Sequence, residues 1–351
     1  MKTKDFFKRL IGQPTSDELR RTEKEARSEA KRQQKQAEKR AAKEQQRQAE
    51  AAKAEAILEA ERQVIREYEA EAAKPGFDPR IPHPSINHNQ KPTGNYQDYY
   101  TRFVSEFLLR YLPSLLEIAR YQPGQQDFSM LDYGCGLGRL GFAFSQYFGT
   151  RMDRRYIGYE VHPTACEFMQ RTYASYPNTR FFGDAIKLED SYVELQEKAD
   201  SASHERIDAA QVNLRDRISD KLDLQFSGSV FTHMYRHAIV HVLKEFSALM
   251  KPTGVCVNTW LIVDDLAAAS LRCGLADRVL PYESEKDGFL YYLQDNPLMC
   301  TAYRLDALKA IYAEAGHEII DIRWGKWSGR TPTQDFSWQD AVISRPIRTS
   351  A

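Results

Sequence analysis

The sequence lacks the features that mark several classes of protein. Its five cysteines are scattered and never form a CxxC motif, so it predicts neither a disulfide framework nor a metal site. It has no run of about 18 uncharged apolar residues, which argues against a transmembrane helix. The first residues contain only a broken apolar run, unlike a secretory signal peptide. These absences predict a protein of the reducing cytoplasm.

An excess of one charge is also missing, because 49 Lys and Arg residues balance 49 Asp and Glu residues. A uniformly basic nucleic-acid coat is therefore excluded, and we expect no nucleic-acid partner. The balance hides an asymmetry, since residues 1–47 hold 15 basic and 8 acidic residues. If the protein binds an anionic surface, we expect the N-terminal part of the chain to make that contact.

Residues 15–74 consist mainly of Ala, Glu, Gln, Lys and Arg and contain almost no glycine or proline. This composition predicts a long helix. Apart from Leu19, large aliphatic residues are missing from it before Ile57, so the helix cannot bury a face by itself. It is either solvated along its length, the coiled coil of a homodimer, or a docking helix for a protein partner.

Residues 1–12 place Phe6, Phe7, Leu10 and Ile11 on one helical face among basic side chains. This pattern is typical of a peripheral membrane anchor. It is equally typical of a short helix that packs on its own protein, which is the interpretation we favour.

The rest of the chain divides by composition. Residues 1–74 form the charged extension, the Pro-rich residues 75–95 predict a linker, and residues 96–351 predict a compact domain. In that domain apolar strands alternate with helices, which predicts an α/β fold with a doubly wound, mainly parallel sheet. Two segments near the end, HEIIDIRWG and WQDAVISR, should pair as an antiparallel hairpin. A polar insertion (188–222) and a long stretch that could form a substrate lid (264–303) interrupt the pattern.

The most informative run is LDYGCGLGR (131–139), which places Gly134, Gly136 and Gly138 between a strand and a helix. Glycine permits positive φ and a close approach of the backbone to a ligand, so this turn predicts a nucleotide-type ligand at the strand ends. The run also spells the GxGxxG motif of NAD-binding proteins. The preceding acid Asp132, the tighter GxGxG spacing and the antiparallel hairpin argue against NAD.

These features resemble the first motif of the class I S-adenosylmethionine-dependent methyltransferases. The segments that resemble the family's later strands and turns are YIGYEVHP (156–163), FFGDA (181–185), LDLQFSGSVFTHM (222–234) and LKEFSALMKPTGVCVNTW (243–260). The resemblance covers about residues 96–345. It implies a seven-stranded Rossmann-like sheet and S-adenosyl-L-methionine as the cofactor.

The resemblance also assigns roles to individual residues. Glu160 would hydrogen-bond the ribose hydroxyls, and Asp184 would contact the adenine amino group. Asp132 would either orient the glycine loop or bind the methionine amine, and the two roles stay open. These assignments make the glycine loop the centre of the cofactor site.

A narrower resemblance concerns the acceptor. The segments SVFTHM, DNPLMCTAY (295–303) and GKWSGR…WQDAV (325–342) are similar to a bacterial subgroup often encoded among surface-polysaccharide genes. This implies methyl transfer to an O, rather than N, acceptor on a glycan or sugar-containing metabolite. His233 follows the fourth strand and is the expected catalytic base. Trp327 and Arg330 either stack on that substrate or pack the final hairpin.

Two other functions fit the same sequence. One is a small-molecule, lipid or quinone methyltransferase held at the membrane surface by residues 1–12. The other is a non-catalytic scaffold that binds S-adenosylmethionine and recruits a partner through its N-terminal helix. Detection of methyl transfer would argue against the scaffold.

Overall fold

The computed structural model describes residues 16–81, 101, 103–186, 206–284, 288–333 and 337–348. Its internal contacts divide the chain into two units, Met1–Gln63 and Val64–Ala351. Several of the sequence features lie partly or wholly outside the described residues. The largest omitted parts are the apolar pattern of residues 1–12, the greater part of the Pro-rich segment 75–95, and the first part of the insertion 188–222.

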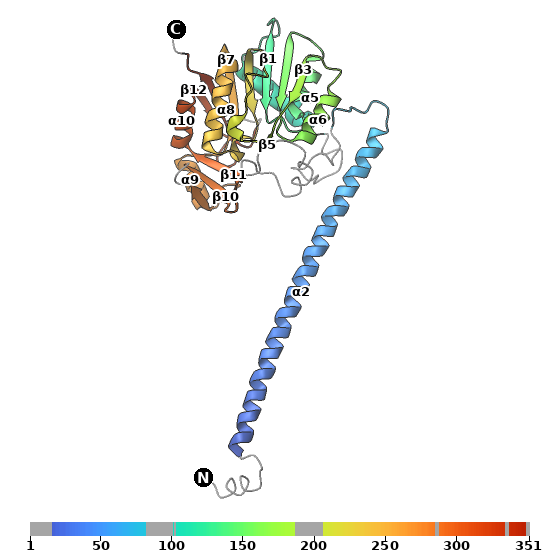
Figure 1. The fold of residues 1–351 in the computed structure, drawn as a ribbon, viewed down its shortest axis with the longest axis vertical. Helices are drawn as coiled ribbons and strands as arrows, with labels where there is room; N and C mark the ends of the chain where they lie inside the picture. Colours follow the sequence, from blue (N-terminus) through green and yellow to red (C-terminus); the bar gives the residue numbers. More distant parts are fainter. Residues whose placement is uncertain are drawn as a thin grey trace. The chain divides into compact units, whose positions relative to one another are not determined.

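The predicted N-terminal helix is confirmed as α2 (Ser16–Ala72), which has 57 residues (Figure 1). At 1.5 Å per residue it is about 86 Å long. Every described side chain between Arg20 and Gln63 is exposed, as expected for a stretch with so few large aliphatic residues. None of the described helices has the length and apolarity needed to cross a bilayer.

The second unit contains a seven-stranded sheet in the order β12-β13-β7-β6-β1-β2-β3. Its strands are β1 (Phe128–Tyr133), β2 (Arg154–Tyr159), β3 (Thr179–Phe182), β6 (Leu222–Ser227), β7 (Met250–Trp260), β12 (His317–Arg323) and β13 (Asp340–Pro346). The pairs formed by β3, β2, β1, β6 and β7 are parallel, whereas β13 is antiparallel to both of its neighbours. This confirms the doubly wound, mainly parallel Rossmann-like sheet with an antiparallel pair near its end.

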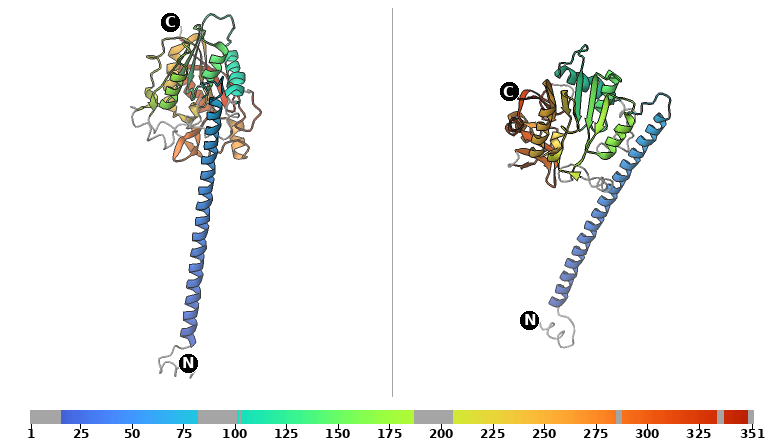
Figure 2. Two further views of the ribbon diagram at one scale, coloured as in Figure 1. Left: turned by 90° about the vertical axis from the view of Figure 1, so that its right-hand side faces the viewer. Right: turned by 45° about the horizontal axis from the view of Figure 1, so that its top comes forward.

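Both faces of the sheet are covered, so the central strand β1 is buried along its whole length. Neighbouring residues of β1 show this, because Met130 joins one hydrophobic cluster and Leu131 joins the other. The first cluster includes α4 (Leu112–Ile118), α5 (Arg139–Phe148) and α6 (Pro163–Thr172), and the second includes α8 (Arg236–Leu249) and α10 (Leu305–Glu314). Helices accordingly flank the strands in the two views of Figure 2.

The helical segment that precedes β1 has an unusual form. Phe103–Tyr111 is a π-helix, η2, and α4 follows it directly. Pro113 lies in the first turn of α4. Because proline has no N–H and its ring clashes with the carbonyl four residues earlier, it disfavours an ordinary α-helical turn just before it. The cation of Arg139 lies 4.7 Å from the ring of Phe107, which holds η2 against the start of α5.

The stretch 264–303 folds as α9 (Asp265–Arg272) followed by β9 (Tyr282–Ser284), β10 (Phe289–Leu293) and β11 (Asn296–Arg304). With β8 (Ile262–Val263) these strands form a second sheet in the order β8-β11-β10-β9. Figure 1 shows α9, β10 and β11 together at one end of the domain, next to α8 and α10. This stretch therefore forms a second, smaller sheet beside the main one.

The described part of the insertion, from Arg206 onward, packs on α8. Its β5 (Arg206–Ile207) pairs with β4 (Ala185–Ile186), and the 3-10 helix η4 (Ala209–Gln211) follows. Leu214 and Ile218 are buried in the hydrophobic cluster that includes α8. The buried carboxylate of Glu245 on α8 accepts hydrogen bonds from the backbone N–H groups of Leu214 (2.9 Å) and Arg215 (3.2 Å). The end of the insertion is therefore firmly anchored.

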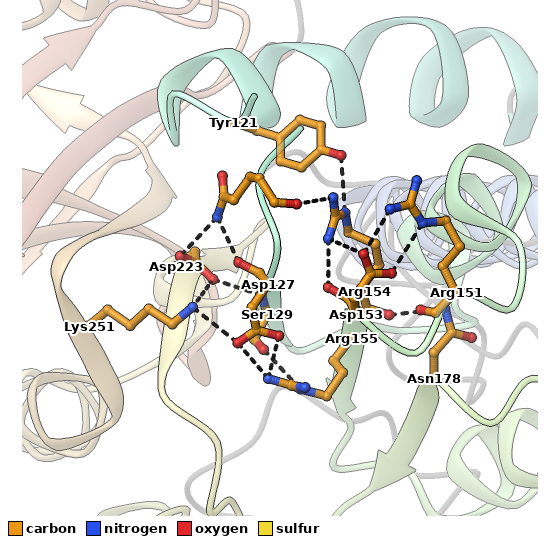
Figure 3. A network of polar contacts seen from close by, with 11 residues as sticks. Tyr121, Asp127, Ser129, Arg151, Asp153, Arg154, Arg155, Asn178, Asp223 and Lys251 are labelled. Atoms are coloured by element: carbon orange, nitrogen blue, oxygen red, sulfur yellow. Dashed lines mark hydrogen bonds and ion pairs between the residues drawn. The ribbon is translucent and has the colours of Figure 1, made fainter. Parts of the chain in front are cut away.

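Ion pairs and hydrogen bonds connect the amino ends of the central strands (Figure 3). Lys251 on β7 pairs with Asp223 on β6 at 2.7 Å, and Arg155 on β2 donates to Asp127, before β1, at 2.9 Å. Arg154 is fully buried and donates to the Tyr121 hydroxyl at 3.1 Å. These pairs occupy the amino edge of the sheet. The loops of the opposite, carboxyl edge carry the residues singled out in the sequence.

The segment after α2 also packs on the domain. Arg80 is 7% exposed, donates to the Ser145 hydroxyl on α5 at 2.7 Å, and pairs with Asp78. Its guanidinium lies 4.9 Å from the Phe142 ring and 5.1 Å from the Tyr176 ring. The last turns of α2 therefore lead into a segment that the domain holds.

Candidate active site

The residues expected to bind a nucleotide-type ligand follow three adjacent parallel strands. The glycine loop follows β1, Glu160 follows β2, and Asp184 lies two residues beyond β3. Because parallel strands end at the same edge, their loops meet there. The backbone joins them, since the Gly134 N–H donates to the Tyr159 carbonyl at 2.8 Å and the Glu160 N–H donates to the Phe182 carbonyl at 3.0 Å.

The glycine loop needs its glycines for two different reasons. Gly134, Gly136 and Gly138 all have positive φ, at 78°, 57° and 74°, in the left-handed region that favours glycine. A Cβ atom on Gly134 would lie 2.3 Å from the side chain of Val230, so the loop packs directly on the loop after β6. A Cβ atom on Gly136 would meet nothing within 4 Å. Gly136 therefore leaves room in which a ligand can approach the backbone.

Glu160 is 4% exposed, and both of its carboxylate oxygens are held by the backbone. Oε2 accepts from the Gly136 N–H at 2.7 Å, and Oε1 accepts from the His162 N–H at 3.0 Å. A carboxylate oxygen accepts more than one hydrogen bond, so both oxygens keep acceptor capacity. Two oxygens fixed side by side match a pair of adjacent hydroxyl groups.

Asp184 lies next to Glu160. The backbones of their two loops are in such close contact that a Cβ atom on Gly183 would overlap the Glu160 carbonyl. Asp184 Oδ2 accepts from the Tyr159 hydroxyl at 3.2 Å, and Oδ1 accepts from Arg217 Nη1 at 2.7 Å. Its side chain keeps 26% of its surface exposed, so it remains reachable by a ligand.

Asp132 is 3% exposed and accepts a hydrogen bond of 2.5 Å from the Tyr156 hydroxyl. Burial raises the pKa of Asp132 to about 7, although the hydrogen bond from Tyr156 opposes that rise. This bond lies among buried side chains and joins β1 to β2 two residues before Gly134. Asp132 thus helps to fix the strand from which the glycine loop starts.

His233 ends a short 3-10 helix, η5 (Phe231–His233), in the loop that contacts Gly134. Its Nδ1 lies 2.8 Å from the Leu298 carbonyl of β11. Because a carbonyl only accepts, this contact assigns the proton to Nδ1 and makes Nε2 the basic nitrogen. Burial lowers the pKa of His233 below its usual value, against the effect of the Leu298 and Met299 carbonyls. The imidazole is therefore neutral near pH 7.

The two other histidines of this region, His237 and His241, have environments different from that of His233. His237 is exposed and stacks on Tyr235, whereas His241 Nε2 lies 2.7 Å from the Val212 carbonyl. His241 is half-buried, because the insertion lies against it. Among the described residues no group of three His, Cys, Asp or Glu side chains is placed to hold a metal ion.

The three segments that resemble the polysaccharide-associated subgroup contact one another. His233 reaches the 295–303 segment through Leu298. The hydroxyls of Ser229 and Thr259 both donate to Gln339 Oε1, at 3.0 and 2.6 Å. Ser229 has a φ of 58°, a strained value for a residue other than glycine. These contacts fix the loop after β6 against β7 and the start of β13.

Trp327 and Arg330 lie in the packing of the hairpin. The Trp327 indole is fully buried and donates to Asp340 Oδ2 at 2.6 Å. The Arg330 side chain is 8% exposed, pairs with Asp264, and lies 4.1 Å from the Trp324 ring. Neither side chain presents an open face to a sugar in this structure.

Sequence reasoning missed several residues of this edge. Tyr159 was hidden because it precedes Glu160 in an apolar strand, where an aromatic residue is ordinary. Arg217 belongs to no motif, and Gln339 lies in the 325–342 segment but was given no role there. The Leu298 carbonyl is a backbone group, whose role the residue type does not indicate. Glu160, Asp184 and His233 could be identified because each follows a strand within a segment that resembles the methyltransferase motifs.

The sequence matches no known family profile. Solved structures similar to this chain are S-adenosylmethionine-dependent methyltransferases at low identity. One from Clostridium acetobutylicum is 11% identical with a TM-score of 0.41, and the match covers 72% of this chain and 98% of that chain. An O-methyltransferase family protein from Burkholderia thailandensis is 11% identical with a TM-score of 0.42, covering 76% and 63%. The glycopeptide N-methyltransferase MtfA, in complex with S-adenosyl-L-methionine, is 10% identical with a TM-score of 0.38, covering 66% and 92%.

Proposed function

We propose that this chain is an S-adenosylmethionine-dependent methyltransferase whose cofactor lies at the carboxyl edge of the seven-stranded sheet. The observation that carries the proposal is the Glu160 carboxylate, which the Gly136 N–H holds at 2.7 Å beside the glycine loop. The loop and the acid come from adjacent parallel strands, so the sheet itself sets their spacing. An adjacent acid, Asp184, completes the set of polar groups that a nucleoside needs.

The donors and acceptors of this edge fit the proposed cofactor. The Glu160 oxygens suit the two ribose hydroxyls, and the exposed part of Asp184 suits the adenine amino group. Gly136 offers open space and a backbone without a side chain, where the rest of the cofactor would lie. S-adenosylmethionine supplies an activated methyl group on a positively charged sulfur. The acidic lining of this edge favours a ligand that carries such a charge.

The protein's part in the reaction is to position the acceptor and to accept its proton. His233 lies in the loop that packs on Gly134, so it stands beside the cofactor site. With Nδ1 donating to Leu298, its Nε2 lone pair is the group that would take the proton of an acceptor hydroxyl. Correct alignment of the hydroxyl supplies the rest of the rate, because a methyl sulfonium is already reactive.

The proposed acceptor is a hydroxyl group of a glycan or sugar-containing metabolite. Its support is the resemblance of three segments, which in this structure meet at the loop after β6. We propose a cytoplasmic location, and the exposed helix α2 as the part that meets a second copy or a protein partner. No observation on the described residues favours the scaffold over methyl transfer. The membrane-surface methyltransferase depends on residues 1–12, which lie outside the described residues.

Thermal unfolding with and without ligand tests the cofactor. S-adenosylhomocysteine should raise the melting temperature of the chain and NADH should not, because a ligand that binds only the native state stabilises it. Glu160→Ala should weaken S-adenosylhomocysteine binding roughly 10- to 100-fold, as expected for a lost charge-assisted hydrogen bond. Glu167→Ala, which removes an exposed acid of α6, is the matched control and should bind normally.

Transfer of labelled methyl groups to a panel of hydroxyl- and amine-bearing glycosides tests the reaction. Label in the hydroxyl-bearing products supports the proposed acceptor class. Binding of S-adenosylhomocysteine without transfer to any fraction of a cell extract would favour the scaffold. Stabilisation by NADH alone would overturn the assignment of the cofactor.

A further inference from the structure

One basic side chain of the insertion reaches the cofactor edge. Arg217 Nη1 donates to Asp184 Oδ1 at 2.7 Å and lies 3.4 Å from the Gly183 carbonyl. The Arg217 side chain is 35% exposed, so it lies at the rim of this edge. Arg217 comes from a segment that the main sheet does not need for its own strands. Its contact with Asp184 therefore indicates a role in the ligand site rather than in the main sheet.

Arg217 is held in place from several sides. Its guanidinium lies 4.4 Å from the ring of Phe182, the last residue of β3, and its carbonyl accepts a hydrogen bond from Arg180. The turn that carries it is closed by the Arg217 N–H, which donates to the Leu214 carbonyl at 3.1 Å. Glu245 on α8 fixes that turn through the Leu214 N–H. A guanidinium so constrained has little rotamer freedom left to lose.

The consequence for Asp184 is a fixed carboxylate. One oxygen accepts from Arg217 and the other from the Tyr159 hydroxyl, so rotation of the carboxylate would break both hydrogen bonds. An adenine base presents an amino donor, whereas hypoxanthine presents an oxygen acceptor at the same position and an N–H donor beside it. A fixed carboxylate accepts from the amino group and repels the oxygen. A carboxylate free to turn could reach the neighbouring N–H.

We propose that Arg217 is a positioning residue that makes the nucleoside site selective for adenine, by locking the orientation of Asp184. The inference rests on the proposed function, because it takes Asp184 as the residue that faces the base. It gives the insertion a role in cofactor recognition. The effect acts through Asp184 and requires no contact between Arg217 and the base.

Calorimetric titration of the full chain with two nucleosides tests the proposal. S-adenosylhomocysteine and S-inosylhomocysteine differ only in the group that Asp184 is proposed to face and in the N–H donor beside it. The native chain should prefer the adenine compound. Arg217→Ala should weaken S-adenosylhomocysteine binding about tenfold and leave S-inosylhomocysteine unchanged or tighter, so that the ratio of the two affinities falls at least about tenfold.

Two further variants separate positioning from simple loss of structure. Arg215 belongs to the same turn but pairs with Glu245 at 2.7 Å, so Arg215→Ala loosens the same turn and leaves the ion pair of Arg217 with Asp184 in place. It should keep the affinity ratio of the native chain. Arg217→Lys retains the charge with a single ammonium donor and should restore part of the preference.

Three results would count against the inference. Equal weakening of both nucleosides by Arg217→Ala and by Arg215→Ala would mean that the turn is only structural. Weakening of S-inosylhomocysteine alone would mean that Arg217 touches the base itself. An unchanged ratio in Arg217→Ala would remove it from recognition while leaving the proposed function intact. If the native chain binds neither nucleoside, the proposed function fails first.

Discussion

The Tyr156 hydroxyl donates a hydrogen bond of 2.5 Å to the Asp132 carboxylate, and both side chains are buried between the sheet and its covering helices. A buried carboxylate loses the stabilisation that water gives its charge, and a hydrogen bond from one hydroxyl replaces only a small part of that stabilisation. The native state therefore favours the protonated form of Asp132 more strongly than the unfolded chain does. This has a measurable effect on stability.

Asp132→Asn should stabilise the chain more at higher pH. The pKa of Asp132 is raised from 3.8 to about 7 in the folded protein, so its ionisation removes stability as the pH rises through that window. Asparagine cannot ionise and still accepts from Tyr156. The gain in unfolding free energy over the native chain should grow by up to about 3 kcal/mol between about pH 5 and about pH 8. Denaturant titrations at the two pH values measure it, and a gain independent of pH would contradict the prediction.

Alanine at Gly134 and at Gly136 should have different effects. Both positions have positive φ, which costs a residue with a side chain roughly 1–2 kcal/mol. Gly134→Ala also forces a Cβ atom to within 2.3 Å of Val230, so it should lower the melting temperature further. Gly136→Ala meets no protein atom and should mainly abolish binding of S-adenosylhomocysteine. Equal loss of stability in the two variants would mean that the loop repacks.

His233→Asn should remove the base while keeping the contact with Leu298, because its amide can donate to that carbonyl. Methyl transfer should fall by at least about tenfold, and binding of S-adenosylhomocysteine should not change. His237→Ala is the control, because His237 is exposed. The lowered pKa of His233 keeps the imidazole neutral below its usual 6.5, so the acidic limb of the rate profile should lie below that pH. Full activity in His233→Asn would mean that His233 is not the base and that alignment of the acceptor with the cofactor supplies the rate.

Arg80→Ala should destabilise the domain, because it removes a buried cation from between two aromatic rings and leaves Asp78 without this ion pair. The expected cost is about 2–4 kcal/mol. Arg151→Ala, which breaks an exposed pair with Asp153, should change stability little. Chemical denaturation of the two variants checks this.

The same contacts bear on where the compact domain begins. A chain that starts at Val64 keeps the contacts of Arg80, whereas one that starts at Asn95 loses them. The longer of these two chains should therefore melt at the higher temperature. Identical melting temperatures would mean that the contacts of residues 64–81 add no stability.

The sequence predicts best where a strand, a glycine turn and an acid follow one another. The order of β1, the loop at Gly134 and the acid Glu160 could be deduced because the backbone alone brings adjacent parallel strands together. The alternation of strands and helices predicted the main sheet for a similar reason, since each helix must return the chain to the same edge.

Features that depend on distant residues could not be deduced. Trp327 has the residue type of a sugar-binding aromatic, yet its place is set by Asp340 and by packing against the second sheet. The strands of that sheet pair residues such as Phe289 and Tyr303 in a region of mixed polarity, which concealed them. Arg217 matters only because the insertion folds back to β3, which no local pattern indicates.

The position of β13 has a consequence for how the chain assembles. β13 follows β12 in the sequence but lies between β7 and β12, so Asp340 pairs with Trp260 at a sequence separation of 80 residues. While the chain is being synthesised, β12 emerges before the strand that joins it to the sheet, and β7 has one unpaired edge in the meantime. Completion of the sheet must await β13, and pairings of such large sequence separation form slowly. While the edge of β7 is unpaired, the nascent protein is most prone to associate with other chains.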